Sequence, residues 1–151
     1  MLDHFGIIDR DLRLYIAVGP NHPPNGFVAY LKYVPSTEPS LWKSKAGIYY
    51  RRVLRFYSVR NVWTASLSMP TSLDPTTMSM IPIVPRDEVW TIIDSRKRAQ
   101  ELIQHCTDEL ECLAAELVSE LALQYGLPQQ CIGISGSIMS VSYTHLTLPT
   151  N

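Results

Sequence analysis

The residues best suited to chemistry form a short turn near the end of the chain. Gly136-Ser137 follows the apolar run 131–134, whose branched residues predict a buried strand. A glycine lets the backbone turn sharply beside an anion, and a serine hydroxyl adds a hydrogen-bond donor. If a helix begins there, its free N–H groups favour negative charge. The pattern is typical of a phosphate-binding turn, and an ordinary strand-to-helix turn is the competing interpretation.

Transfer chemistry at such a turn also needs carboxylates that hold a metal ion. The sequence contains no Asp or Glu after Glu120. We therefore expect no catalytic residues, no metal site and no tightly bound cofactor in this chain. A serine hydrolase is not supported either, because the segment 133–137 does not place a serine at the centre of a Gly-x-Ser-x-Gly elbow.

Two predicted helices precede this turn. Asp94 is a candidate N-cap for a helix over 95–106, and Asp108 can cap a second helix that ends at Gly126. The second helix has an apolar stripe at the helical period, which we expect to pack on the strand that starts near Cys131. The stripe consists of Leu110, Leu113, Ala114, Leu117 and Leu121.

The first half of the chain predicts strands. Alternating or apolar runs at 13–18, 27–34 and 47–56, separated by breaker-rich turns, favour an antiparallel meander. The segment 57–68 fits either a short helix or a fourth strand. Four prolines within 69–85 predict a connector or surface loop.

Together these elements predict an α+β protein. A β-rich region over 1–68 and a proline-rich connector over 69–85 come first. A helical part over 86–140 then leads into the start of an α/β domain, and its first residues, 86–93, form a short helix or turn. The segment 141–151 shows neither strand alternation nor helical spacing and is excluded from the fold.

Several segments resemble, in matching order, archaeal nucleotidyltransferases of the polymerase-β superfamily. The resemblance covers most of residues 9–138. It is carried by the following segments: Asp9-Arg10-Asp11 with the strand 14–18, the turn His22-Pro23-Pro24, the strand 28–35, the arginine-bearing segment 49–53, the segment 84–89, and the turn 132–138. No single motif is highly specific, and the ordered set carries the comparison.

The resemblance implies transfer of a nucleoside monophosphate from a nucleoside triphosphate, assisted by two Mg²⁺ ions. In that family an Asp-x-Asp pair follows the Gly-Ser turn and holds the metal. Only Gly136 and Ser137 carry over here, as nucleotide-binding positions that contact the triphosphate. Mg²⁺ and the triphosphate are therefore expected for an intact parent protein, and this chain is expected to be a truncated, inactive fragment of it.

The last residues support truncation. The ten residues 141–150 match a translation of the transposase-end adaptor used to prepare short-read DNA libraries. Such a segment is an artefact and is set aside. We expect the biological sequence to be interrupted after Ser140, and a natural, poorly ordered tail is the alternative.

A basic stretch offers a second kind of function. Between Glu38 and Asp74 the chain has six basic residues and no acid, interleaved with aromatic residues that include Tyr49, Phe56 and Tyr57. Cations that meet phosphates beside rings that stack on bases can bind nucleic acid. The candidates are Lys43, Lys45, Arg51, Arg52 and Arg55. A non-enzymatic nucleic-acid-binding or regulatory module is thus the alternative function, and a half-buried strand with inward rings and solvated arginines is the simpler interpretation.

Composition limits the remaining possibilities. With 151 residues, 46% hydrophobic content and a net charge of −1, the chain has the size and charge of one globular domain. Its three cysteines match no zinc or redox spacing, so we expect free, buried thiols in a reducing cytoplasm. No signal segment and no apolar run of membrane-spanning length is evident. We expect no membrane partner, and the sequence leaves the oligomeric state open.

Overall fold

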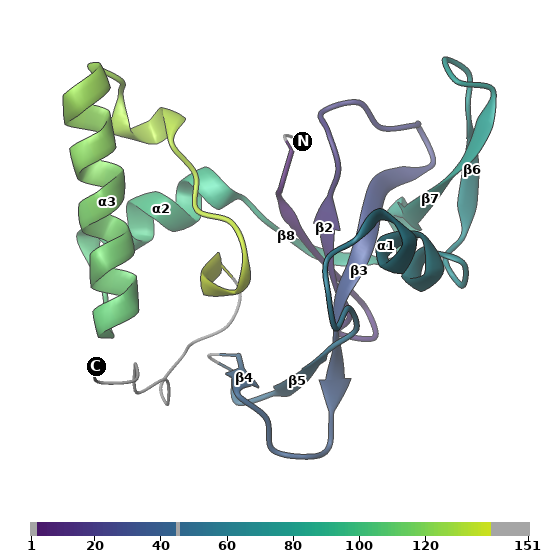
Figure 1. Ribbon diagram of the computed structural model, residues 1–151, viewed down its shortest axis with the longest axis horizontal. Helices are drawn as coiled ribbons and strands as arrows, with labels where there is room; N and C mark the ends of the chain where they lie inside the picture. The colour runs from purple at the N-terminus through teal and green to yellow at the C-terminus, as the bar shows by residue number, and fades with distance from the viewer. Residues whose placement is uncertain (1–2, 45, 140–151) are drawn as a thin grey trace. The chain divides into compact units, whose positions relative to one another are not determined.

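The structure is a computed structural model that describes residues 3–44 and 46–139 (Figure 1). Lys45 and the adaptor-like segment 141–151 lie outside these residues. The chain divides into two compact units, Met1–Pro35 with Arg51–Ile92 and Ser36–Tyr50 with Ile93–Asn151. The described part combines an antiparallel sheet with three α-helices, which confirms the α+β class.

The first unit is built on a meander of three strands. β1 (Gly6–Asp9), β2 (Leu14–Ala17) and β3 (Gly26–Ser36) pair antiparallel, with Gly6 opposite Ile16 and Tyr15 opposite Leu31. The alternating runs therefore predicted β2 and β3 correctly. β1 was missed because it has four residues and shows little periodicity before the Asp9 turn.

A β-hairpin replaces the connector expected over 69–85. β6 (Thr71–Asp74) pairs with β7 (Ser79–Pro85), and β7 also pairs with β3. The prolines fit because they avoid the hydrogen-bonded positions of the hairpin. Pro82 lies opposite Thr71, next to the pair in which Ile83 N donates to Pro70 O at 2.9 Å, and Pro75 lies in the turn. Antiparallel ladders alternate bonded and non-bonded pairs, so a proline in a non-bonded pair costs no bond to β6.

Two further elements complete the first unit. The segment 57–68, for which the sequence left two options, forms helix α1 (Val59–Ser66), capped by Ser58. The helix or turn expected over 86–93 is only partly correct, because a 3₁₀ turn, η1 (Arg86–Glu88), is followed by strand β8 (Val89–Ile93). The strand order in this unit is β3-β2-β1-β8.

The core of the first unit combines side chains of the meander with those of neighbouring residues, among them Val84 of β7. It consists of Phe5, Ile7, Tyr15, Ala17, Phe27, Ala29, Met69 and Val84. Asp9 is buried at its edge and shapes the turn between β1 and β2. Its carboxylate accepts hydrogen bonds from Arg13 Nε at 2.7 Å and Tyr15 Oη at 2.9 Å. Burial and the bond to Asp9 raise the pKa of Tyr15, and the Asp9-Arg10-Asp11 segment therefore has a structural role.

The second unit contains a short hairpin and two helices. β4 (Trp42–Lys43) pairs with the start of β5 (Tyr49–Arg52), which is shorter than the strand predicted over 47–56. Helices α2 (Ser95–Gln104) and α3 (Glu109–Tyr125) begin at the caps expected from the sequence, Asp94 and Asp108. α3 ends at Gly126, whose φ of 61° is the left-handed conformation expected at a helix end.

The buried side of α3 differs from the predicted one. α2 packs against small residues of α3, and the core of the unit consists of Ala99, Leu102, Ala115, Val118 and Ile134. Of the predicted stripe, Leu110, Leu113 and Leu117 are exposed and Leu121 is half-buried, whereas Ala114 packs against this core. Alanine side chains are small and allow two helix axes to approach closely. The side of α3 that carries Ala115 therefore packs against α2 in place of the leucine side.

The expected strand from Cys131 is also wrong. Two 3₁₀ turns, η2 (Gln129–Cys131) and η3 (Ser137–Met139), flank an irregular segment. Ile134 N donates to Ser95 O at 2.9 Å, and its side chain joins the helical core. The branched residues are thus buried against helices without strand pairing. Among the residues that the structure describes, no helix has the length and apolar character of a membrane span.

Candidate functional site

The candidate nucleotide-binding turn has the backbone that its glycine predicts. Gly136 has φ of 87°, and a Cβ added there would meet no atom within 4 Å. The 3₁₀ turn η3 starts at the next residue, Ser137, and Met139 N donates to Gly136 O at 3.4 Å. Among the described residues, nothing therefore crowds the Cβ side of Gly136, and a left-handed turn of this kind can admit close approach of an anion.

The N-terminal end of α2 anchors this turn. Ser95 is buried, and a Cβ on Gly133 would lie 2.7 Å from Ser95 Oγ. Only a glycine allows this approach, which also brings Ile134 N to Ser95 O. Ile132 and Ile138 pack against the same helical core. The chain is therefore held on both sides of residues 135–137.

Carboxylates suitable for a metal ion are not gathered at the turn. In the part of the chain described, no group of three or more His, Cys, Asp or Glu residues could hold a metal. Asp94 and Asp108 serve as helix caps, with their Oδ1 atoms accepting from Arg96 N and Glu111 N. Burial raises the pKa of Asp94, but the hydrogen bonds from Arg96 and Lys97 N–H outweigh it and lower the pKa overall. Both carboxylates are therefore engaged as helix caps.

The basic candidates fall into two groups. Lys43 lies in the second unit, with its Nζ 5.0 Å from the centre of the Tyr49 ring. Arg51, Arg52 and Arg55 lie in the first unit. The Arg52 guanidinium lies 4.7 Å from the Tyr57 ring centre, and that of Arg55 lies 5.7 Å from the Phe56 ring centre. In the first unit, Arg52 and Arg55 therefore each lie beside an aromatic ring.

The aromatic residues of this stretch do not all point inward. Tyr50 is buried, as the simpler interpretation requires, whereas Phe56 and Tyr57 are 68% and 51% exposed. Burial raises the pKa of Tyr57, but hydrogen bonds from Arg52 and Lys32 outweigh it and lower the pKa. Trp63 on α1 is exposed as well, which sequence reasoning missed. The sequence did contain an indication of this exposed surface. Val59, Trp63 and Leu67 are spaced four residues apart and form an apolar stripe on α1 that is exposed rather than buried in the core.

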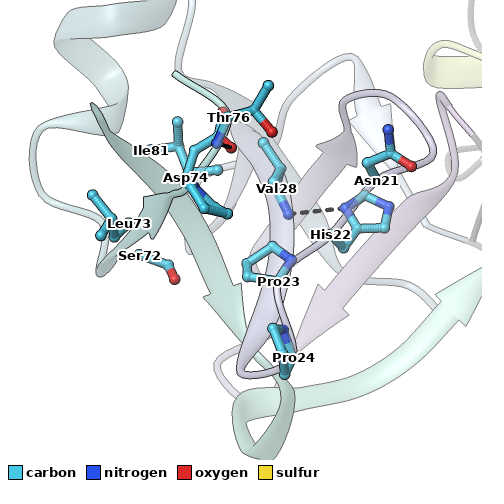
Figure 2. Close-up of a pocket in the computed structure, with 11 residues that line it drawn as sticks. Asn21, His22, Pro23, Pro24, Val28, Ser72, Leu73, Asp74, Thr76 and Ile81 are labelled. Carbon is cyan, nitrogen blue, oxygen red and sulfur yellow. Dashed lines mark hydrogen bonds between the residues drawn. The ribbon is translucent and has the colours of Figure 1, made fainter. Parts of the chain in front are cut away.

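A cavity of about 750 Å³ lies in the first unit between the turn 21–24 and the hairpin β6–β7 (Figure 2). Val28 and Ile81 line its apolar part, and Ser72 and Asp74 contribute polar groups. Val28 N donates to His22 Nδ1 at 3.1 Å, so neutral His22 carries its proton on Nε2. Burial, with the positive charge of Arg86, lowers the pKa of His22. Sequence reasoning missed this cavity because it treated residues 69–85 as a connector.

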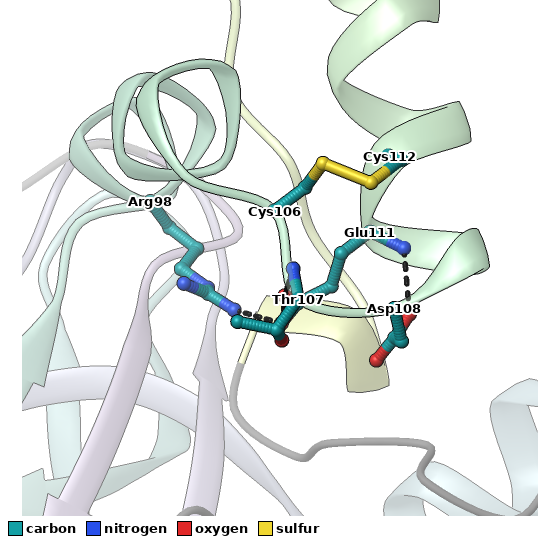
Figure 3. The surroundings of a disulfide bond; sticks show 6 residues. All are labelled: Arg98, Cys106, Thr107, Asp108, Glu111 and Cys112. Carbon is teal, nitrogen blue, oxygen red and sulfur yellow. Dashed lines mark hydrogen bonds and ion pairs between the residues drawn. A yellow bond between two sulfur atoms is a disulfide. The ribbon is translucent and has the colours of Figure 1, made fainter.

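A disulfide joins the end of α2 to the start of α3 (Figure 3). Cys106 and Cys112 have Cα atoms 5.1 Å apart, so the expected free thiols are wrong for this pair. The reversal at 105–108 brings Cys106 onto the first turn of α3, which no short cysteine motif signals. Cys131 is free but exposed rather than buried. Persistent disulfides are typical of oxidising compartments and of intracellular proteins from hyperthermophiles.

Comparisons against protein-family models, curated proteins and solved structures each found no match to this chain.

Proposed function

We propose that the chain is part of a nucleotidyltransferase-like protein and that its Gly136-Ser137 turn contacts the phosphates of a nucleoside triphosphate. The observation that supports this is the left-handed Gly136, in open space, directly before the first residue of η3. Backbone N–H groups that follow such a turn favour an anion. The anchoring of Ile134 on Ser95 fixes the position of the turn before any ligand arrives.

We propose binding without nucleotidyl transfer. In the parent protein, Mg²⁺ would neutralise the triphosphate and polarise the reacting phosphate. This chain has no acid after Glu120, and Asp94 and Asp108 are engaged as helix caps. Its own residues can therefore orient an anion at the turn but cannot hold the metal that the transfer requires.

Fluorescence titration with N-methylanthraniloyl ATP tests the binding proposal. Backbone contacts alone should give a weak complex, with a Kd of about 1 mM. Gly136→Val should remove it, because a β-branched residue does not adopt φ of 87°. Gly47→Val is the matched control, since Gly47 has φ of 86° and equally open surroundings. Equal binding by wild type and Gly136→Val would contradict the proposal, as would Mg²⁺-dependent release of pyrophosphate above a protein-free control.

A second candidate function is binding of single-stranded nucleic acid by the first unit. It is favoured by the exposure of Phe56, Tyr57 and Trp63 in a segment that also carries Arg52 and Arg55. Exposed rings provide stacking faces for bases, and guanidinium groups contact phosphates. Stacking of this kind has little sequence preference, so we propose a surface for flexible single strands rather than a base-specific site.

Anisotropy of a labelled 12-nucleotide RNA and a DNA of the same sequence tests this candidate. One phosphate contact each from Arg51, Arg52 and Arg55 predicts that log Kd rises by about 2 per decade of salt. Phe56→Ala/Tyr57→Ala should weaken binding, at about 1–3 kcal/mol for each stacked base. Lys97→Ala, an exposed cation on α2, should leave it unchanged. A Kd that does not change with salt concentration, or no binding at 20 mM salt, would argue against the candidate.

For the cellular location we propose the cytoplasm, with the Cys106–Cys112 disulfide formed there as in intracellular proteins of hyperthermophilic archaea. Trapping thiols in intact cells with a maleimide-linked polymer tests this. One modified cysteine, Cys131, is expected before reduction and three after it. Three modified cysteines before reduction would show that the bond is absent in that compartment.

A further inference from the structure

Helix α3 has an apolar side that faces away from its own core. Leu110, Leu113 and Leu117 are 36%, 49% and 57% exposed, and Leu121 is half-buried. Their spacing of three, four and four residues places them in one row along the helix. A different side of the helix, with Ala115 and Val118, is buried against α2. α3 is therefore apolar on two sides, and the described residues of its unit bury one of them.

An acidic border runs beside this leucine row. Glu109, Glu116 and Glu120 are exposed, and their spacing of seven and four residues puts them on one line of the helix. The line lies about 85° from the leucine row, on the side away from the buried Glu111. No Lys or Arg follows Arg98 in the sequence, so no base on α3 itself neutralises this border.

We propose that the leucine row of α3 docks an amphipathic helix of a partner protein whose leucine-like stripe is bordered by Lys or Arg. The row from Leu110 to Leu121 extends about 16 Å along the helix axis. About three turns of a second helix can pack a ridge of side chains along this length. Apolar side chains supply the contact area, and the acidic border selects the sign of the partner's charge. A row of partly exposed leucines with a charged rim is typical of a protein interface.

A second copy of this chain is a poorer fit for the same face. In an antiparallel pair of α3 helices, the acidic border of one copy would face that of the other. In a parallel pair, the border would meet no positive charge, because α3 contains no Lys or Arg. The charge of the surface therefore favours a basic partner over self-association.

A synthetic 21-residue peptide tests the proposal. It has Leu at heptad positions a and d, Lys along the bordering positions and Ala elsewhere, and a control peptide replaces each Lys by Glu. Anisotropy with the full chain should show at least about tenfold tighter binding of the Lys peptide at 50 mM salt, and added salt should reduce this difference. Glu116→Lys/Glu120→Lys should reverse the preference toward the Glu peptide.

Leucine variants then locate the site. Leu113→Gln/Leu117→Gln should weaken binding of the Lys peptide at least about tenfold, because central apolar contacts dominate interface energy. Leu73→Gln, at a leucine of similar exposure in the first unit, is the control and should have no effect. Far-UV circular dichroism of each variant should match the wild type, since the replaced side chains are exposed.

Three results would overturn the proposal. The first is equal affinity for the Lys and Glu peptides. The second is unchanged affinity after Leu113→Gln/Leu117→Gln. The third is a dimer in sedimentation equilibrium that this double substitution dissociates, because the leucine row would then serve a second copy of the chain.

Discussion

Glu111 should be the charged residue whose loss destabilises the second unit most. It is 2% exposed, and its Oε1 accepts a hydrogen bond from Arg98 Nη2 at 2.5 Å (Figure 3). Its Oε2 accepts from Thr107 N at 3.0 Å and from Thr107 Oγ1 at 2.6 Å. Arg98 is itself only 11% exposed. Glu111→Ala leaves a largely buried guanidinium without this carboxylate, which costs about 3–5 kcal/mol.

Urea unfolding followed at 222 nm measures this cost, because α2 and α3 provide most of the helical residues. With a typical m value of about 2 kcal/mol per molar urea, a loss of about 4 kcal/mol lowers the midpoint by about 2 M. Glu111→Gln keeps the volume and one acceptor, so we expect a loss of about 1.5–3 kcal/mol. Glu120→Ala, on the exposed side of the same helix, should change stability by less than about 0.5 kcal/mol.

A double-mutant cycle separates the ion pair from the rest of the network. Arg98→Ala/Glu111→Ala should be less destabilised than the sum of the two single variants, since the double variant leaves neither charge buried alone. Additive losses, or a loss below about 1 kcal/mol in Glu111→Ala, would refute the assignment of Arg98 and Glu111 as a coupled buried pair.

Three other predictions use the same unfolding assay. Cys106→Ser/Cys112→Ser should lower stability by about 2 kcal/mol without reductant, the cost expected for opening a six-residue separation, and should match the reduced wild type in dithiothreitol. Gly133→Ala should cost about 1–3 kcal/mol, because its Cβ would lie 2.7 Å from Ser95 Oγ, whereas an unchanged midpoint would show that this segment is not held against α2. Asp94→Ala should cost about 1 kcal/mol at pH 7. Because hydrogen bonds lower the pKa of folded Asp94 below its ordinary 3.8, its contribution is complete above that value and fades as pH falls through the lowered pKa, so a wild-type advantage that stays constant as the pH is lowered below 3.8 would contradict this role.

Local chemistry made part of this fold predictable from the sequence. Asp94 and Asp108 were recognised as caps because a cap depends on hydrogen bonds to residues two or three positions away. Gly126 and Gly136 were recognised as turn residues for the same local reason, and both adopt positive φ. The nucleotide-binding role of Gly136 stays a prediction, since the backbone shows the turn and not its ligand.

Long-range competition decided what the sequence did not predict. Helix α3 offers two apolar sides, and the choice of the Ala115 side depends on α2, which periodicity along α3 does not reveal. The prolines of 69–85 suggested a loop. A strand tolerates proline only where the pairing register needs no N–H group, and the register of β7 with Thr71 and β3 is not visible in the sequence. The run at 131–134 looks like a strand by composition, but burial against Ser95 and α2 replaces strand pairing.

The division of the chain into interleaved units has a consequence for biosynthesis. Each unit combines two separate stretches, so Met1–Pro35 cannot complete its fold until Arg51–Ile92 has left the ribosome. Contacts between such distant stretches require closure of long loops, which slows folding. The nascent chain would therefore carry unpaired strand edges during elongation, when intermolecular pairing competes with native sheet formation.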